Sequence, residues 1–321
     1  MTRIITADAL DGLRQISSGS CDTCVTSPPY YRLRDYGCDG QIGLESTPEK
    51  YVDRLVGVFR EVRRVLRDDG TLWLNIGDCY AGSGKGAASH PDNAAKYKQG
   101  TNKGMVGARQ TIQTRIPKCK PKDLIGIPWM VAFALRNDGW YLRQDIIWAK
   151  PNPMPESVKD RCTKSHEYIF LLSKSAKYYY DAEAISEPVA DSTVTRVFGK
   201  TNGVMKAAAP RYGGKKYTEN PKMFYRTKSG NAYDYRERRN KRDVWMVSTK
   251  PFKGAHFATF PPDLIRPCIR AGSRSGGIVL DPFFGSGTVG MVAKQEGRRF
   301  IGIDINPDYS EMAFNRINNS K

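Results

Sequence analysis

The stretch of sequence that decides the fold reads IVLDPFFGSGTVG and spans residues 278–290. Its apolar beginning predicts a buried strand, and the residues from Thr288 onward predict a helix that the Thr288 hydroxyl can cap. Between them, Gly285 and Gly287 allow the backbone to approach a ligand closely. The turn contains neither Gly-Lys-Ser nor Gly-Lys-Thr, so a phosphate-binding P-loop is not predicted.

An acidic residue follows one strand later. The segment GIDIN places Asp304 at the end of a second predicted strand, about twenty residues beyond the glycines, where a carboxylate can bind ribose hydroxyls. A Gly-rich turn by itself is also typical of an ordinary tight turn. The order strand, turn, helix, strand and acid favours an adenosine-containing cofactor.

Outward from this stretch, the chain alternates predicted strands and helices. Strands are predicted over 21–26, 70–78, 140–150, 276–281 and 298–305, helices over 47–70, 124–139, 261–273 and from Pro307, and a hairpin over 167–175 and 177–185. Thr47 is expected to cap the first long helix and Gly70 to end it. This alternation predicts an α/β fold with a mostly parallel sheet covered on both faces, in which ligands bind at the carboxyl ends of the strands.

The loop Thr26-Ser27-Pro28-Pro29-Tyr30 also follows a predicted strand. Proline has no N–H, so the loop offers mainly acceptors, namely the Ser27 hydroxyl oxygen and the Pro28 carbonyl. Tyr30 adds a flat aromatic face. Such an array suits a planar group with an exocyclic NH₂, such as a nucleobase amine. A stiff surface turn is the alternative interpretation.

The net charge of +18 in 321 residues is concentrated in two segments. Residues 81–123 hold nine Lys/Arg and two Asp/Glu, and residues 191–243 hold fourteen and five. The second segment interleaves seven aromatic residues with its basic ones, a composition that suits phosphate contacts and base stacking. Nucleic-acid binding is the favoured interpretation, and a basic surface that aids solubility is the alternative.

Together, Ser-Pro-Pro-Tyr and the distant Asp-Pro-Phe-x-Gly-Ser-Gly closely resemble an amino-methylating DNA methyltransferase that uses S-adenosylmethionine. The catalytic loop comes first and the cofactor loop last, as in the beta group of that family. Segments 148–175 and 250–265 also resemble family blocks. The resemblance implies a Rossmann-like methyltransferase fold with circularly permuted motif order and an inserted target-recognition region. Residues 1–190 would form the catalytic part, including the basic loop 81–123, residues 191–243 the recognition region, and 244–321 the cofactor-binding part.

The resemblance also implies roles for individual residues. Ser27 and Pro28 would accept the hydrogens of the target amine beside Pro29, and Tyr30 would stack on the flipped base. Cofactor-binding positions would be Asp8, Thr26, His256, Phe257, Thr259, Phe260, Asp281, Pro282, Phe283, Gly285, Gly287, Thr288, Asp304 and Asn306. Among these, Asp281 is expected near the methionine amino group, Asp304 at the ribose hydroxyls and Asp8 at the adenine edge. Asp78 is a further catalytic candidate that could assist proton loss, with the capping of a turn as its alternative.

The resemblance implies methylation of an exocyclic amine but leaves two candidate target bases. In the family, Ser-Pro-Pro-Tyr usually accompanies the N4 amine of cytosine, which we therefore favour, with the N6 amine of adenine as the alternative. RNA methylation and a non-catalytic DNA-binding relative are further alternatives. Methylation at carbon 5 of cytosine needs a nucleophilic cysteine, and Pro267-Cys268 lies inside a predicted helix.

Double-stranded DNA is the expected macromolecular partner and a cognate restriction endonuclease a candidate one, with the recognition sequence and the oligomeric state left open. Cys21 and Cys24 form a lone CxxC in a strand, so no metal site is expected. No apolar run approaches the ~20 residues that cross a bilayer. The N-terminus resembles no secretory signal, so we expect a cytoplasmic protein without membrane contacts.

Overall fold

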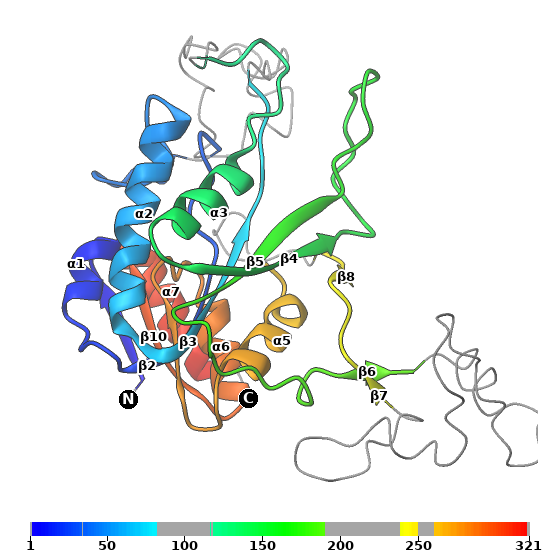
Figure 1. Ribbon diagram of the computed structural model, residues 1–321. Helices are drawn as coiled ribbons and strands as arrows, with labels where there is room; N and C mark the ends of the chain where they lie inside the picture. The colour runs from blue at the N-terminus through cyan, green and yellow to red at the C-terminus, as the bar shows by residue number, and fades with distance from the viewer. Residues whose placement is uncertain are drawn as a thin grey trace, which may run out of the picture. The chain divides into compact units, whose positions relative to one another are not determined.

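The computed structural model describes residues 2–33, 35–81, 116, 118–189, 238–249 and 260–319 (Figure 1). The chain divides into two compact units, one formed by Met1–Asp181 with Asp243–Lys321 and the other by Ala182–Arg242. The first unit carries the large sheet and both loops singled out by the sequence. The His256–Thr259 segment and most of the two basic segments lie outside the described residues.

The first unit is built on an eight-stranded sheet in the order β1-β10-β9-β2-β3-β5-β4-β8. Its strands are β1 (Arg3–Thr6), β2 (Cys21–Thr26), β3 (Leu66–Ile76), β4 (Tyr141–Ala149), β5 (His166–Ser173), β8 (Val244–Met246), β9 (Ile278–Asp281) and β10 (Arg299–Asp304). All pairs are parallel except β3 with β5 and β5 with β4. The mostly parallel sheet predicted from the sequence is therefore confirmed.

The sheet has its switch point between β9 and β2. From β9 the chain passes through a helix to β10 on one side, whereas from β2 it passes through a helix to β3 on the other. A crevice opens at the carboxyl ends of two such strands, where ligands bind in open α/β sheets. The cofactor-type loop follows β9 and the Ser-Pro-Pro-Tyr loop follows β2, so both reach this crevice. The N-terminal strand β1 lies beside the late strand β10, as the permuted motif order requires.

Helices cover both faces of the sheet (Figure 1). They are α1 (Ala9–Arg14), α2 (Pro48–Val65), α3 (Ile127–Asn137), α5 (Pro262–Gly272), α6 (Thr288–Gln295) and α7 (Pro307–Asn319). The first three pack together on one face and the last three on the other. On the second face, a Cβ at Gly272 of α5 would lie 2.6 Å from the Trp73 indole nitrogen, so only glycine allows this approach of α5 to the sheet.

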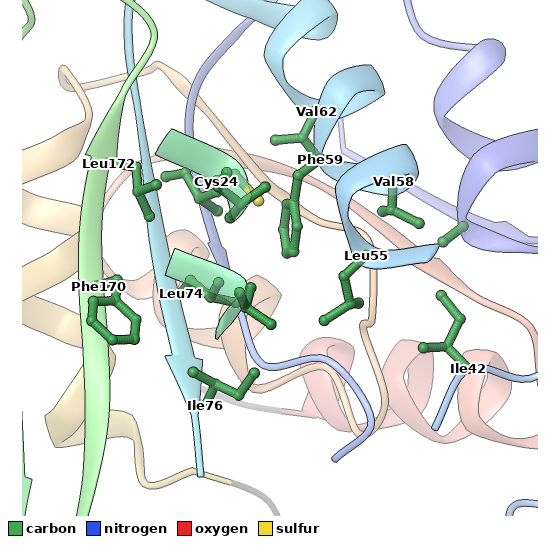
Figure 2. Close-up of a cluster of buried hydrophobic side chains, with 14 of the residues drawn as sticks. Cys24, Ile42, Leu55, Val58, Phe59, Val62, Leu74, Ile76, Phe170 and Leu172 are labelled. Atoms are coloured by element: carbon green, nitrogen blue, oxygen red, sulfur yellow. The ribbon is translucent and has the colours of Figure 1, made fainter. Parts of the chain in front are cut away.

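The core on the first face follows from the apolar stripe of α2. Leu55, Phe59 and Val62 recur at helical spacing and point toward Leu74 and Ile76 of β3 (Figure 2). Full burial of each such side chain stabilises the fold by about 1.5–3 kcal/mol. Cys24 lies in the same core and Cys21 is also buried, as expected of small apolar side chains, and burial raises the pKa of Cys21 to about 11.

Two local predictions were wrong. Thr47 caps α2 as expected, its hydroxyl accepting the Lys50 N–H at 3.3 Å, but the helix ends at Val65 and β3 begins at the next residue, so Gly70 lies within the strand. Residues 167–175 and 177–185 form no hairpin with each other: β5 instead pairs with β3 and β4, and the described residues 177–185 are turns and irregular chain. Pairing inside the large sheet gives β5 two hydrogen-bonded neighbours, where a hairpin would give it one.

The second unit contains β6 (Glu187–Pro188) paired antiparallel with β7 (Arg238–Arg239). Glu187 forms ion pairs with Arg239 at 3.2 Å and with Arg242 at 2.7 Å. The boundaries 1–190, 191–243 and 244–321, and a recognition role for the middle region, stay predictions. Among the described residues, no helix combines the length and apolar character needed to cross a membrane.

Candidate active site

A cavity of about 850 Å³ lies at the carboxyl ends of the strands in the first unit. Both loops line it, the first with Ser27, Pro28, Pro29 and Tyr30 and the second with residues 281–286. The cavity also receives Asp8, Asp78, Phe260, Thr288, Asp304 and Asn306 from the residues that the sequence predicts. Two loops about 250 residues apart in the chain therefore share one hollow.

The two loops are hydrogen-bonded to each other. The Thr26 hydroxyl donates to Asp281 Oδ1 at 2.6 Å, and the Phe283 N–H donates to the same oxygen at 3.0 Å. Asp281 is almost fully buried, and this burial raises the pKa of its carboxyl to about 7, although both hydrogen bonds oppose the shift. Thr26 is itself buried behind the cavity wall, so it contacts the expected cofactor site through Asp281.

Asp304 shapes the other end of the cofactor loop. Its Oδ2 accepts the Gly285 N–H at 2.6 Å and its Oδ1 accepts the Asn306 N–H at 2.8 Å. A carboxylate has about four lone-pair sites, so acceptor capacity remains for hydroxyl groups. The Ala7 N–H donates to the Asp304 carbonyl at 2.9 Å, which places Asp8 at the same end of the cavity, where it also caps α1 by accepting the Leu10 N–H.

Two residues of the glycine turn act differently from the prediction. Gly287 does not line the cavity: it occupies the left-handed region with φ +74°, and a Cβ there would lie 2.7 Å from Ala313 Cβ, so it allows α7 to pack closely. Thr288 does not cap α6. Gly287 occupies the capping position, and Arg316 donates to the Thr288 hydroxyl oxygen at 2.9 Å.

The Ser-Pro-Pro-Tyr loop is held in place by contacts to α2 and to residues of the cavity wall. The hydroxyl of the buried Tyr51 on α2 donates to the Pro29 carbonyl at 2.8 Å. The Tyr30 ring packs on Gly77, where a Cβ would approach a ring carbon to 2.7 Å, so glycine is needed there. The Tyr30 hydroxyl donates to Glu167 Oε2 at 2.6 Å. Burial and the adjacent Glu167 carboxylate raise the pKa of Tyr30 well above its ordinary value, so the phenol stays protonated.

Asp78 lines the cavity but uses its carboxylate on backbone. Its oxygens accept the N–H groups of Cys79 at 2.9 Å, of Gly126 at 3.0 and 3.1 Å and of Ile127 at 3.1 Å. Gly126 and Ile127 lie at the start of α3, so Asp78 satisfies amides that a helix start leaves without partners, and Cys79 is its own neighbour in the chain. The geometry favours the capping interpretation over assistance to proton loss.

Several cavity residues were missed by the sequence reasoning. They are Asn75, Trp148, Lys150, Glu156, Lys164, His166 and Glu167. Most fall in the segment 148–175, which resembles a family block but received no residue roles. A signal was available in β5, where Glu167 shares the alternating face of Ile169 and Leu171, both buried. A charged residue on the same strand face as buried apolar residues indicates a role in binding or catalysis. His256, Phe257 and Thr259 lie outside the described residues.

The comparison with known families is decisive. The model of the N6/N4 methylase family, described as DNA methylase, matches residues 21–315. The chain belongs to the N6/N4 DNA methylase family. The expected class of amino-methylating enzymes is thereby confirmed, and S-adenosylmethionine, the methyl donor of this class, is its cofactor.

Sequence similarity to curated relatives covers nearly the whole of this methylase. It is 48% identical over 314 residues to the Type II methyltransferase M.Cfr9I of Citrobacter freundii, covering 97% of this chain and 85% of that one. It is 46% identical over 319 residues to the Type II methyltransferase M.SmaI of Serratia marcescens, covering 98% and 90%. Both relatives are Type II methyltransferases, the methylating enzymes of restriction-modification systems, and this methylase is of the same class.

Solved structures confirm the fold. The PvuII DNA methyltransferase (cytosine-N4-specific) matches with a TM-score of 0.61 at 17% identity, covering 99% of this chain and 93% of that one. The M1.HpyAVI–SAM complex matches with a TM-score of 0.51 at 17% identity, covering 98% and 100%. The methylase's own cavity fits the cofactor. Asp281 offers a carboxylate for an ammonium group, and Asp304 offers acceptors for hydroxyls.

Proposed function

We propose that this methylase transfers the methyl group of S-adenosylmethionine to the exocyclic N4 amine of a flipped cytosine in double-stranded DNA. The observation that carries the proposal is the 2.6 Å hydrogen bond from Thr26 to Asp281. It fixes the acceptor loop against the cofactor loop within one cavity, so an amine at Ser27 is held beside the methyl donor.

The chemistry of the amine explains what the loop has to do. The lone pair of an exocyclic base nitrogen is delocalised into the ring, which makes it a poor nucleophile. The Ser27 hydroxyl oxygen and the Pro28 carbonyl accept the two amine hydrogens, and this localises the lone pair and turns it toward the methyl group. When bound, the cofactor would supply a methyl group on a sulfonium sulfur, which leaves as a neutral thioether, and the methylated amine would release one proton to solvent. Alignment by the protein then accounts for much of the remaining acceleration.

The other residues bind and orient. Tyr30 supplies the ring on which the flipped base stacks, which offsets part of the few kcal/mol that unstacking costs. Asp281 would hold the methionine ammonium and Asp304 would accept from the ribose hydroxyls. Asp8 would lie at the adenine edge. No covalent intermediate is required, and no residue of this mechanism acts as a nucleophile.

Cytosine is favoured over adenine by the Ser-Pro-Pro-Tyr sequence, which in the family usually accompanies the N4 amine of cytosine. Double-stranded DNA is favoured over RNA because the family is one of DNA methylases. Residues 191–243, with fourteen Lys/Arg among them, are the proposed target-recognition region. A cognate restriction endonuclease in the same cell is part of the proposal, since the relatives are Type II methyltransferases.

The test is transfer of labelled methyl groups to unmethylated genomic DNA and, in parallel, to total RNA, followed by nucleoside mass spectrometry. N4-methylcytosine in DNA is the expected product. N6-methyladenine would overturn the base assignment and leave the fold and cofactor in place. Label in RNA alone, or cofactor binding without transfer to any nucleic acid, would overturn the proposed function.

A further inference from the structure

A largely buried carboxylate, that of Glu167, lies at the centre of a polar cluster beside the acceptor loop. Glu167 Oε2 accepts the Tyr30 hydroxyl at 2.6 Å and Asn75 Nδ2 at 3.2 Å. Its Oε1 accepts Lys150 Nζ, whose ammonium also lies 4.3 Å from the centre of the Trp148 ring. The Glu167 and Lys150 side chains are only 15% and 18% exposed, and both line the cavity.

The position of Glu167 in the sheet is unusual for a charged residue. On β5 it shares a face with Ile169 and Leu171, and it pairs across strands with Trp148 of β4. Burial of a carboxylate is costly unless it is paired and hydrogen-bonded. The ion pair with Lys150 and the two further donors meet this requirement, but the fold alone does not call for a glutamate in an apolar register.

The cluster acts on Tyr30 rather than on a proton of the substrate. Three donors already use the Glu167 carboxylate, which leaves about one of its four lone-pair sites for a further partner. By contrast, the Tyr30 side chain is held at its ring and at its hydroxyl, which also lies 3.4 Å from Asn75 Oδ1. Gly77 lies against the ring, and Glu167 holds its hydroxyl.

We propose that Glu167 is a positioning residue for methyl transfer: by accepting the Tyr30 hydroxyl it fixes the ring on which the target base stacks, so that the target amine meets Ser27 and Pro28 in the reactive geometry. Lys150 holds the Glu167 carboxylate in place. The proposal rests on the stacking role given to Tyr30 in the proposed function. Small misplacements of reacting groups lower rates strongly, so the loss of this contact affects the chemical step more than cofactor binding.

A double-mutant cycle tests this. Single-turnover methyl transfer to genomic DNA is measured for wild type, Glu167→Ala, Tyr30→Phe and the double variant, together with S-adenosylmethionine affinity. Each single change is expected to lower the rate about tenfold or more, because each removes a hydrogen bond to a charged group. Since both changes remove the same contact, the double variant is expected to lie within about twofold of the slower single variant. Cofactor affinity stays unchanged in all four.

Two further variants separate positioning from stability. Glu167→Gln keeps an acceptor for the Tyr30 hydroxyl and is expected to restore the rate to within about threefold of wild type. Glu296 is a matched control, since it is also a largely buried glutamate paired with arginine, Arg270 at 2.6 Å, but lies outside the cavity. Glu296→Ala is expected to lower the melting temperature and leave the single-turnover rate unchanged.

Three outcomes would overturn the positioning role. The rate losses of the single variants could multiply in the double variant, or Glu167→Gln could be as slow as Glu167→Ala. The third outcome is a loss confined to cofactor affinity. Wild-type transfer to adenine would contradict the cytosine assignment while leaving the cycle readable, because the label reports either base. A wild type that transfers no label to DNA would overturn both proposals.

Discussion

The Thr26 hydroxyl donates to Asp281 Oδ1 at 2.6 Å across 255 positions of sequence. The two residues end the neighbouring strands β2 and β9, so this bond joins the two loops at the switch point of the sheet. It also ties the geometry of the acceptor loop to the protonation state of a buried acid in the cofactor site.

Replacement Thr26→Val removes that donor with little change in volume. The hydroxyl lowers the pKa of Asp281, so its loss raises that pKa further above about 7 and leaves less carboxylate at neutral pH. We expect S-adenosylmethionine affinity near pH 7 to fall about tenfold, as for loss of a hydrogen bond to a charged group. Calorimetric titration between about pH 6 and pH 9 measures this, and the deficit should shrink as the pH rises. An affinity equal to that of wild type across this pH range would show that the Thr26 hydroxyl does not affect cofactor binding through Asp281.

The raised pKa of Asp281 should also make the stability of the cofactor-free protein depend on pH. Its pKa is raised from 3.8 to about 7 in the folded state, so the folded protein holds a proton that the unfolded chain has released between these values. The free energy of unfolding therefore contains a contribution that is present below pH 3.8 and is lost as the pH rises to about 7.

Comparison of wild type with Asp281→Asn isolates this contribution. The variant has no titrating group there, so its stability relative to wild type should increase with pH, by at most about 1.4 kcal/mol per pH unit. Urea unfolding from about pH 5 to pH 8 measures the difference. A difference independent of pH would show that Asp281 titrates normally.

Asp78 is predicted to support structure rather than chemistry. Asp78→Ala leaves three backbone N–H groups without their acceptor and should lower the free energy of unfolding by about 1–2 kcal/mol, as for loss of a helix cap. Asp78→Asn keeps one oxygen and should cost less. Thermal melts measure both, and single-turnover rates should stay within about threefold of wild type. A rate loss above about a hundredfold in a stable Asp78→Asn protein would restore a catalytic role.

Gly287 gives a matched pair with Gly297. Both have positive φ, +74° and +71°, but a Cβ at Gly287 would lie 2.7 Å from Ala313 whereas at Gly297 no described atom lies within 4 Å. Gly297→Ala should cost about 1–2 kcal/mol from backbone strain alone. Gly287→Ala should cost about 1–3 kcal/mol more because α7 must move. Equal losses in denaturant unfolding would show that the packing of α7 is not limiting.

Much of this molecule could be predicted from its sequence because the informative residues are local. The apolar run before Asp281, the glycines after it and Asp304 define strand, turn and acid within 27 residues of chain. Thr47 and Pro48 define the start of α2 in the same way. Both loops, and their place at strand ends, follow from such short-range patterns.

What could not be predicted depends on contacts that are distant in the chain. Glu167 is an ordinary acidic residue until β5 is placed between β3 and β4, which brings it to Tyr30, 137 positions away. Likewise, Gly70 carries a stop signal for a helix, but pairing of β3 with β2 extends the strand through it. Asp78 at a strand end suits catalysis or capping equally until the start of α3 is placed beside it.

The most direct test of the account is the identity of the nucleoside methylated in unmethylated genomic DNA, compared between wild type and Ser27→Ala. Wild type is expected to give N4-methylcytosine, and Ser27→Ala is expected to lower the rate at least about tenfold with cofactor affinity unchanged. N6-methyladenine as the product, or full activity without the Ser27 hydroxyl, would contradict the account.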